Sequence, residues 1–214
     1  MNALIVYCHP VEGSFCSAMR DAAISGLHAA GHNVDVIDLA AEHFNPVMSK
    51  SEWDTYQQGN GEIPAGLERD VSLVKSAEII VFVYPTWWGG LPAQLKGWLE
   101  RVMLPGTAFV FNENNKVRPG LRNIRRIHIA STFGSPWLYV RFVNDNGRRI
   151  LARAFRLNTS LRTRVSTSSL YAMDTATDES MLSISRSTNG GLSTRDLYDM
   201  AASMNVPNQG SSRM

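Results

Sequence analysis

The feature that most constrains the fold is the stretch at residues 79–101, IIVFVYPTWWGGLPAQLKGWLER. Residues 79–83 are apolar and mostly β-branched, as in a strand that is covered on both faces within a parallel sheet. After Pro92 the apolar side chains recur at helical spacing, and proline suits the first turn of a helix because it lacks an N–H group. The stretch therefore predicts a strand and a helix joined by a turn at residues 84–91.

This turn has the composition of a loop that holds a flat ligand. Pro85 and Thr86 make it rigid, and Trp87 and Trp88 offer large π surfaces. Gly89 lets the backbone approach a ligand because no Cβ stands in the way. Ligands of open parallel sheets bind outside the carboxyl ends of the strands, where this turn emerges. The alternative is that one tryptophan fills the core or a subunit interface.

The same patterns predict an α/β fold with five β/α steps and a parallel sheet covered by helices. Further strands are expected at residues 3–7, 34–39, 126–131 and 164–170, and further helices at residues 14–30, 67–77 and 147–157. Residues 40–65 are irregular, and we expect an excursion over the surface that could cover a site.

A length of 214 residues suits one domain, which we place at residues 1–184. Residues 185–214 are rich in Ser, Asn, Gly and Met and predict a frayed or disordered tail. The first residues lack the basic segment of a signal peptide, and no apolar run approaches the roughly 20 residues of a membrane span. We therefore expect a cytoplasmic protein.

The only two cysteines, Cys8 and Cys16, belong to no motif with metal-ligand spacing, so neither a metal site nor a disulfide is expected. Cys16 lies near a predicted helix N-terminus, which favours a reactive thiol, but a packing role is the preferred interpretation.

Charge is segregated along the chain. Residues 1–115 carry 6 basic and 13 acidic groups, whereas residues 116–170 carry 12 basic groups and one acidic group, Asp145. Arg149, Arg153 and Arg156 fall on one helical stripe. A solvated helix face is the default interpretation, and a phosphate-bearing ligand, an acidic partner or nucleic acid are the alternatives. No aromatic residues alternate with the stripe, which weakens the case for nucleic acid.

The loop after the first strand, CHPVEGSFCSA at residues 8–18, places a hydroxyl and backbone amides at a helix N-terminus, which favours phosphate. Together with YPTWWGGLPAQLKGWLERV and the later STFGS loop, it resembles the flavodoxin-like NAD(P)H:quinone oxidoreductases, including the bacterial potassium-efflux ancillary and drug-activity-modulator relatives. The resemblance covers most of residues 1–172 and implies a flavodoxin-like, doubly wound five-stranded parallel sheet of order 2-1-3-4-5.

The resemblance also implies a flavin, FAD or FMN, held by three loops. Its phosphate side would meet His9, Ser14, Phe15, Ser17 and Ala18; its ring would lie beside Pro85, Thr86, Trp87, Trp88 and Gly89; and the other edge of the ring would meet Ser131, Thr132, Phe133, Gly134 and Tyr139.

Three positions depart from the family. Cys16 stands where members commonly show Asn, and Phe133 where some show Gly. Tyr139 matches the tyrosine of the mammalian quinone reductases, but Asp145 stands six residues on, where those enzymes have a histidine. Tyr139 is the expected catalytic residue, acting as a lone hydrogen-bond donor, or else it is only a wall of the pocket.

The resemblance implies two-electron reduction of quinones or similar flat acceptors by NADH or NADPH in a ping-pong mechanism, with the flavin carrying the chemistry. The absence of GxSxG, Walker and HExxH motifs agrees with this class. One alternative is a flavin-binding, redox-sensing regulatory subunit of a membrane transporter. Another is a flavodoxin-type electron carrier, which the Trp-rich turn and a sequence pI of about 8.6 disfavour.

Members of the family are homodimers, so a dimer is expected. The helix at residues 91–102 is a candidate interface through Trp98, with an intradomain core as the equal alternative. The open loop at residues 10–13 and His9 slightly favour FAD over FMN. The choice between NADH and NADPH stays open, although the arginine stripe would favour a 2′-phosphate if it reached the site.

Overall fold

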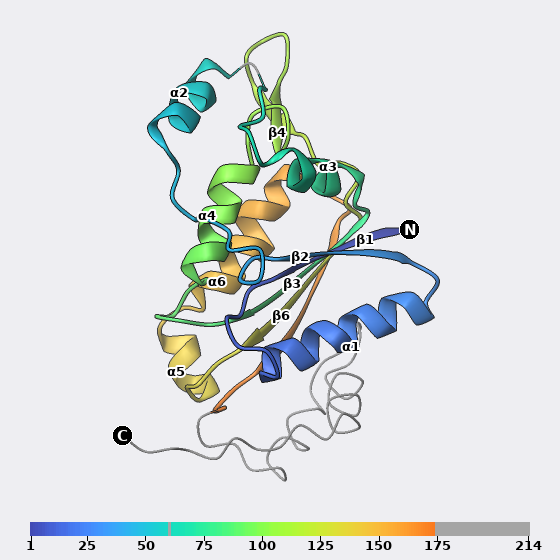
Figure 1. Ribbon diagram of the computed structural model, residues 1–214, viewed down its shortest axis with the longest axis vertical. Coiled ribbons are helices and arrows are strands. Elements are labelled where there is room, and N and C mark those ends of the chain that lie inside the picture. Colours follow the sequence, from blue (N-terminus) through green and yellow to red (C-terminus); the bar gives the residue numbers. More distant parts are fainter. Residues whose placement is uncertain (60, 174–214) are drawn as a thin grey trace.

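A five-stranded parallel sheet organises the chain, in a computed structural model that describes residues 1–59 and 61–173. The strands stand in the order β2-β1-β3-β6-β7, which is the expected 2-1-3-4-5 order (Figure 1). Their bounds are β1 Asn2–Tyr7, β2 Asn33–Asp38, β3 Ile79–Pro85, β6 Arg126–Thr132 and β7 Arg164–Leu170. The order reverses direction at β1 and β3, so the carboxyl ends of these two strands flank the natural ligand crevice of such a sheet.

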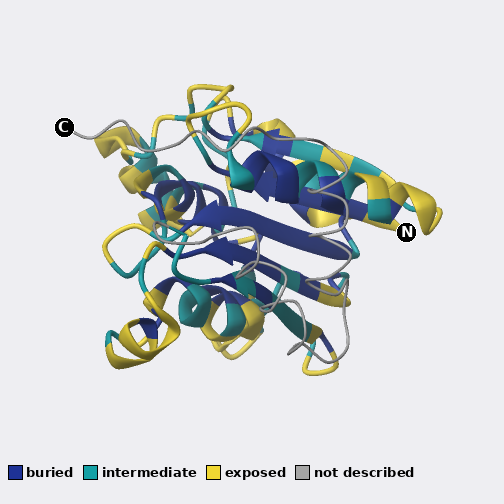
Figure 2. Ribbon diagram, turned by 90° about the horizontal axis from the view of Figure 1, so that it is seen from below, coloured by how far each residue is buried: buried dark blue, intermediate teal, exposed yellow. Residues whose placement is uncertain are grey.

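Helices cover both faces of the sheet. Helix α1 (Phe15–Ala29) packs on one face, and α3 (Glu68–Ser76) and α4 (Ala93–Val102) pack on the other (Figure 1). Every residue of β3 is buried, as its uninterrupted apolar run predicted. Figure 2 shows this buried sheet between its more exposed helices.

The helix predicted at residues 147–157 is a continuous helical run whose pitch changes. It starts as α6 (Asn146–Arg149), widens into a π-helical segment, Ile150–Phe155, and ends in a 3₁₀ turn, Arg156–Asn158. Leu151 and Phe155 from this run are buried beside α4 in the same core. Wide π turns are uncommon and often lie near functional sites.

Three features were not predicted. The excursion at residues 40–65 contains a helix, α2 (Lys50–Gln58), and its described residues line no part of the cleft described below. A short antiparallel hairpin joins β4 (Phe109–Phe111) to β5 (Val117–Pro119). A six-residue helix, α5 (Trp137–Phe142), follows β6.

Trp98 belongs to the intradomain core. Its side chain has no exposed surface, and its indole N–H donates a hydrogen bond to Asp70 Oδ2 at 2.8 Å. The interface role considered for Trp98 is therefore wrong, because a residue buried within its own chain has no surface to offer a second copy. Burial raises the pKa of Asp70, and the indole N–H works against that shift.

The expected tail at residues 185–214 lies outside the described residues. Within the described ranges, none of the helices is both long and apolar enough to cross a bilayer.

Candidate functional site

Three loops meet at the carboxyl edge of the sheet, as the sequence predicted. They connect β1 to α1, β3 to α4 and β6 to α5. The backbone N–H of Thr86 donates to the carbonyl oxygen of Thr132 at 2.8 Å, and Thr132 Oγ1 lies 3.4 Å from Cys16 Sγ. The rings of His9 and Trp87 have their centroids 6.3 Å apart. Residues more than a hundred positions apart in sequence therefore form one structural unit.

A cleft of about 360 Å³ opens between two of these loops and α5. Six of the predicted site residues line it: Thr86, Trp88, Gly89, Phe133, Gly134 and Tyr139. Five further residues complete its wall: Ser135, Val140, Val143, Asp145 and Asn146. Among these five, sequence reasoning singled out only Asp145, and only as a departure from the family.

The turn between β3 and α4 is tight and presents both tryptophans to the outside. Trp87 and Gly90 exchange two backbone hydrogen bonds, of 3.3 and 3.0 Å, across Trp88 and Gly89, which both have positive φ angles of 50° and 67°. Trp88 is fully exposed and Trp87 is about half exposed, so neither fills the core of its own chain. The neighbouring Thr86 Oγ1 is buried and has no hydrogen-bond partner within the described ranges. The turn thus offers flat apolar surfaces next to one unsatisfied hydroxyl.

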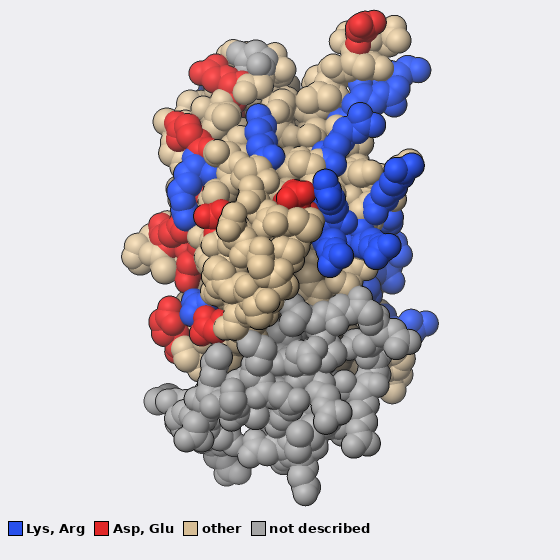
Figure 3. Space-filling view, turned by 90° about the vertical axis from the view of Figure 1, so that its right-hand side faces the viewer, with Lys and Arg blue, Asp and Glu red and all other residues tan. Residues whose placement is uncertain are grey.

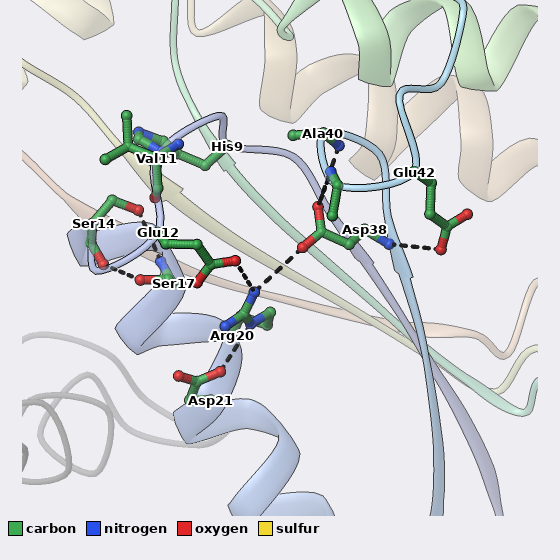
Figure 4. A network of polar contacts seen from close by, with 11 residues as sticks. His9, Val11, Glu12, Ser14, Ser17, Arg20, Asp21, Asp38, Ala40 and Glu42 are labelled. Carbon is green, nitrogen blue, oxygen red and sulfur yellow. Dashed lines mark hydrogen bonds and ion pairs between the residues drawn. The ribbon is translucent and has the colours of Figure 1, made fainter.

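The loop between β1 and α1 is shaped by local hydrogen bonds (Figure 4). Ser14 caps α1, since its Oγ accepts from the N–H of Ser17 at 3.2 Å and its carbonyl accepts from Ser17 Oγ at 2.6 Å. His9 Nδ1 accepts from the N–H of Val11 at 3.1 Å, and burial lowers the pKa of His9. The first amides of a helix have no intrahelical acceptor, so this end of α1 suits a phosphate.

Arg20 ties the same loop to the rest of the sheet. Its guanidinium contacts Asp21 at 2.8 Å, Asp38 at the end of β2 at 3.4 Å and Glu12 in the loop at 3.8 Å (Figure 4). It also lies 4.7 Å from the centre of the Tyr7 ring. One side chain therefore links β1, β2, the loop and α1.

The opposite wall of the cleft rests on the segment that follows β7. Phe133 stacks on Tyr171 with ring centroids 4.9 Å apart, and its N–H donates to the carbonyl oxygen of Leu170 at 2.8 Å. The carbonyl oxygen of Ser135 accepts from the N–H of Ala172 at 3.0 Å. Tyr139, on α5, lines the cleft with 57% of its surface exposed, so its hydroxyl is accessible to a ligand.

Several predicted residues lie behind the cleft rather than on it. Ser131 is fully buried, with its Oγ 3.3 Å from Ser169 Oγ, and Ser17 is nearly so. The buried members of the predicted set are Ser17, Ala18, Pro85, Ser131, Thr132 and Phe133, of which only Phe133 also lines the cleft. The side chains of the others shape the loops, and contact with a ligand would have to come from their backbone.

Both cysteines are buried and free. Burial raises the pKa of the Cys8 and Cys16 thiols to about 11, so neither is a thiolate near neutral pH. This favours the packing interpretation over the reactive-thiol alternative for Cys16. Among the described residues, no group of three or more His, Cys, Asp or Glu side chains is placed to hold a metal ion.

The arginine stripe does not reach the cleft. Arg149, Arg153 and Arg156 are absent from its wall, and Arg156 lines a separate hollow of about 760 Å³ near the first residues of β6 and β7. None of the predicted site residues lines that larger hollow, so we assign the site to the smaller cleft. Figure 3 shows most Lys and Arg side chains on one side of the face drawn and most Asp and Glu side chains on the other.

Comparison with known proteins agrees with this fold. Residues 1–157 match the model of the family Flavodoxin_2, described as a flavodoxin-like fold. The crystal structure of Smu.1420 from Streptococcus mutans superposes with a TM-score of 0.75 at 25% identity, over 94% of this chain and 97% of that one.

Two curated relatives extend the comparison. An uncharacterized NAD(P)H oxidoreductase of Haemophilus influenzae is 35% identical over 136 residues, which are 63% of this chain and 65% of that protein. NAD(P)H dehydrogenase [quinone] 1 of Rattus norvegicus is 30% identical over 153 residues, which are 64% of this chain and 56% of that protein. The chain thus spans less than two thirds of the length of either relative.

Proposed function

Because the chain belongs to the Flavodoxin_2 family of flavodoxin-like folds, we propose that it is a flavin-dependent NAD(P)H oxidoreductase that reduces quinones or similar flat acceptors by two electrons. The names of the relatives from Haemophilus influenzae and Rattus norvegicus support this activity. The observation that carries the proposal is the cleft at the carboxyl edge of the sheet, where residues expected to hold a flat ring line one space.

The residues around the cleft fit a flavin. Thr86 Oγ1 is a buried hydroxyl without a partner in the described chain, and a polar ring edge would satisfy it. Trp88 offers an exposed flat surface on the β3–α4 loop, Phe133 gives the β6–α5 side a buried apolar wall, and the N-terminus of α1, capped by Ser14, suits the phosphate. A flavin held there would supply the chemistry of hydride acceptance from NAD(P)H and of two-electron transfer to the acceptor.

The chain's own residues position the reactants and exclude water. Trp88 and Tyr139 line the cleft with exposed rings against which a planar donor or acceptor stacks, and the buried Phe133 forms the apolar wall behind them. Tyr139 presents its hydroxyl to the cleft, where it donates a hydrogen bond to a carbonyl oxygen of the acceptor. Donor and acceptor would occupy this one cleft in turn, which is the basis of the proposed ping-pong order.

We propose further that the protein is a homodimer. Large apolar side chains next to the cleft are exposed in the single chain, notably Trp88, Trp137, Leu138 and Phe142, the last with 87% of its surface exposed. Contiguous apolar surface of this kind marks an interaction site. A second copy would cover these side chains and help to close the cleft.

The identity of the flavin, the preferred pyridine nucleotide and the cellular location are not decided by the geometry of the cleft. FAD is favoured over FMN by His9 and the open loop at residues 10–13. The arginine stripe would favour the 2′-phosphate of NADPH only if it reached the site. Because Arg149, Arg153 and Arg156 do not line the cleft, the stripe gives no reason to prefer NADPH over NADH. The cytoplasmic location likewise stays a prediction from the sequence.

The decisive test is the absorbance spectrum of the purified protein, followed under nitrogen by addition of NADH or NADPH and then of benzoquinone. We expect flavin bands that bleach with a pyridine nucleotide and return with the quinone. A flavin that stays oxidised with both nucleotides contradicts the reductase and favours the redox-sensing subunit or the electron carrier. Mass analysis of the released cofactor separates FAD from FMN, and a protein that takes up neither flavin contradicts the whole proposal.

A further inference from the structure

Asp145 is held in a left-handed backbone conformation at the wall of the cleft, with φ 43° and ψ 58°. Its N–H donates to the carbonyl oxygen of Val140 at 3.2 Å, and its own carbonyl oxygen accepts from the N–H of Arg149 at 3.2 Å. Gly147 brings this turn against the backbone of Gly90 in the facing loop. The backbone therefore fixes the position of Asp145 from three directions.

Only one of the two carboxylate oxygens of Asp145 accepts a hydrogen bond within the described part of the chain. Its Oδ2 accepts a hydrogen bond from Arg148 Nε at 2.5 Å, and the residue has only 5% of its surface exposed. Its Oδ1 is buried and has no hydrogen-bond partner within the part of the chain that the structure describes. A buried carboxylate oxygen without a donor costs free energy, and native proteins rarely leave one in that state. Among the described residues, the hydroxyl of Tyr84 is likewise buried and without a hydrogen-bond partner, and burial and the Asp145 charge raise the pKa of Tyr84, so this hydroxyl is one candidate donor. Because Asp145 lines the cleft, a ligand in the cleft is the other.

Because Asp145 Oδ1 can only accept hydrogen bonds when ionised, a ligand that pairs with it must carry a hydrogen-bond donor. A carboxylate oxygen accepts hydrogen bonds and repels the lone pairs of a ring carbonyl. A plain quinone carries only carbonyl acceptors on its ring, so it has nothing to offer Asp145. A ring with an amino or hydroxyl substituent has an N–H or O–H group that can reach the free oxygen.

We propose that Asp145 is a specificity-determining residue that selects acceptors bearing an N–H or O–H donor on the ring. This inference rests on the reductase activity proposed above and adds the class of acceptor. Arg148 holds Oδ2, so that Oδ1 is left for the ligand. Hydrogen bonds to charged groups are strong enough to favour the donor-bearing ring by about 10-fold to 100-fold in affinity.

The test compares two rings of nearly the same shape, an aminonaphthoquinone and the methylnaphthoquinone in which a methyl group replaces the amino group. Their dissociation constants are measured on the flavin-loaded protein without NAD(P)H, so that no turnover takes place. We expect the wild type to bind the amino compound about 10-fold to 100-fold more tightly. In Asp145→Asn, which keeps the shape and tolerates the left-handed conformation, the preference should fall to within a few-fold.

The matched control is Asn144→Gly, since Asn144 is the preceding residue, also has a positive φ angle of 78°, and does not line the cleft. This control should keep the wild-type preference. Should Asp145→Asn fail to fold, Asp145→Gly removes the carboxylate without strain at a positive φ. Equal preference in the wild type and the Asp145 variant overturns the inference, and so does a wild type that binds neither ring.

Turnover of the methylnaphthoquinone with NADH and NADPH is measured on the same preparations. A wild type that turns over this compound but shows no preference for the amino ring overturns the role of Asp145 alone. A wild type that turns over neither compound counts against the reductase activity itself.

Discussion

At Gly147 two backbones approach so closely that even a methyl group between them would force a neighbour to shift. A Cβ atom on this residue would lie 3.1 Å from the carbonyl carbon of Gly90 and 3.2 Å from the nitrogen of Leu91. The contact places the start of α6 against the β3–α4 turn, and it thereby positions both walls of the cleft. The absence of a side chain at one residue thus sets the width of the site.

Gly147→Ala tests this contact. We expect the variant to lose about 1–3 kcal/mol of unfolding free energy, because the added methyl group forces α6 away from the turn. Its flavin affinity should fall as well, and urea denaturation with a flavin titration measures both. The facing variant Gly90→Ala is the control, since its Cβ would come no nearer than 4.0 Å to other atoms and its φ is not positive. Equal losses in the two variants would contradict the argument.

His128 gives a prediction about pH. Its Nδ1 lies 2.8 Å from Ser166 Oγ, and burial lowers the pKa of His128 from 6.5 to about 4. Between these values the unfolded chain binds a proton that the folded chain does not bind, so this contribution to stability is complete above about pH 6.5 and decreases as the pH falls toward 4. His128→Asn retains a partner for Ser166 and cannot titrate. We expect the urea midpoint of the variant to fall less than that of the wild type between neutral pH and pH 5; identical pH dependence would refute the assignment.

At the scale of elements, long periodic segments were predictable and short ones were not. The strand at residues 79–83 and the helix at residues 14–30 were found because their apolar patterns are unambiguous. Helix α2 was missed because it buries no residue, so it has no apolar stripe, although the capping box of Ser49 and Glu52 was a readable signal. Helix α5 is only six residues long and keeps large apolar side chains exposed, which no periodicity rule anticipates.

The candidate site also has parts that the sequence predicts and parts that it does not. The three loops were predictable, because the residues after parallel strands must meet at one edge of a sheet. The buried, half-satisfied state of Asp145 was not, because it depends on a left-handed turn and on the contact of Gly147 with Gly90. Local sequence carries little information about contacts between distant backbones.

Arg20 carries the element-scale prediction, because it joins α1 and its loop to β2. Arg20→Gln should lower the unfolding free energy by about 1–2 kcal/mol and should weaken flavin binding, since the loop loses its connection to Asp38. Arg69→Gln is the matched control, because Arg69 pairs with Glu42 at 2.8 Å on an exposed surface away from the cleft. Its effect should stay below about 1 kcal/mol, with unchanged flavin affinity. A larger effect for Arg69 on flavin binding would be inconsistent with this view.

In the part of the chain that the structure describes, α5 and Trp88 expose several large apolar side chains next to the cleft. If this surface is the dimer interface, Phe142→Asp places a charge within it and should convert the dimer to a monomer in light scattering after gel filtration. Trp53→Asp changes an equally apolar but separate exposed residue on α2 and should leave the dimer intact. A wild type that is already monomeric, or a Phe142→Asp variant that stays dimeric, rules out this interface.

The strand order determines how the charged residues are distributed across the sheet. The acidic first half of the chain builds β2, β1 and β3, and the basic segment builds β6 and β7, so the two kinds of charge lie toward opposite edges of one sheet. The described part of the chain is therefore a dipole directed across its strands. We expect such a charge distribution to bind both cation and anion exchangers and, at low salt, to orient an approaching anion toward the β7 side.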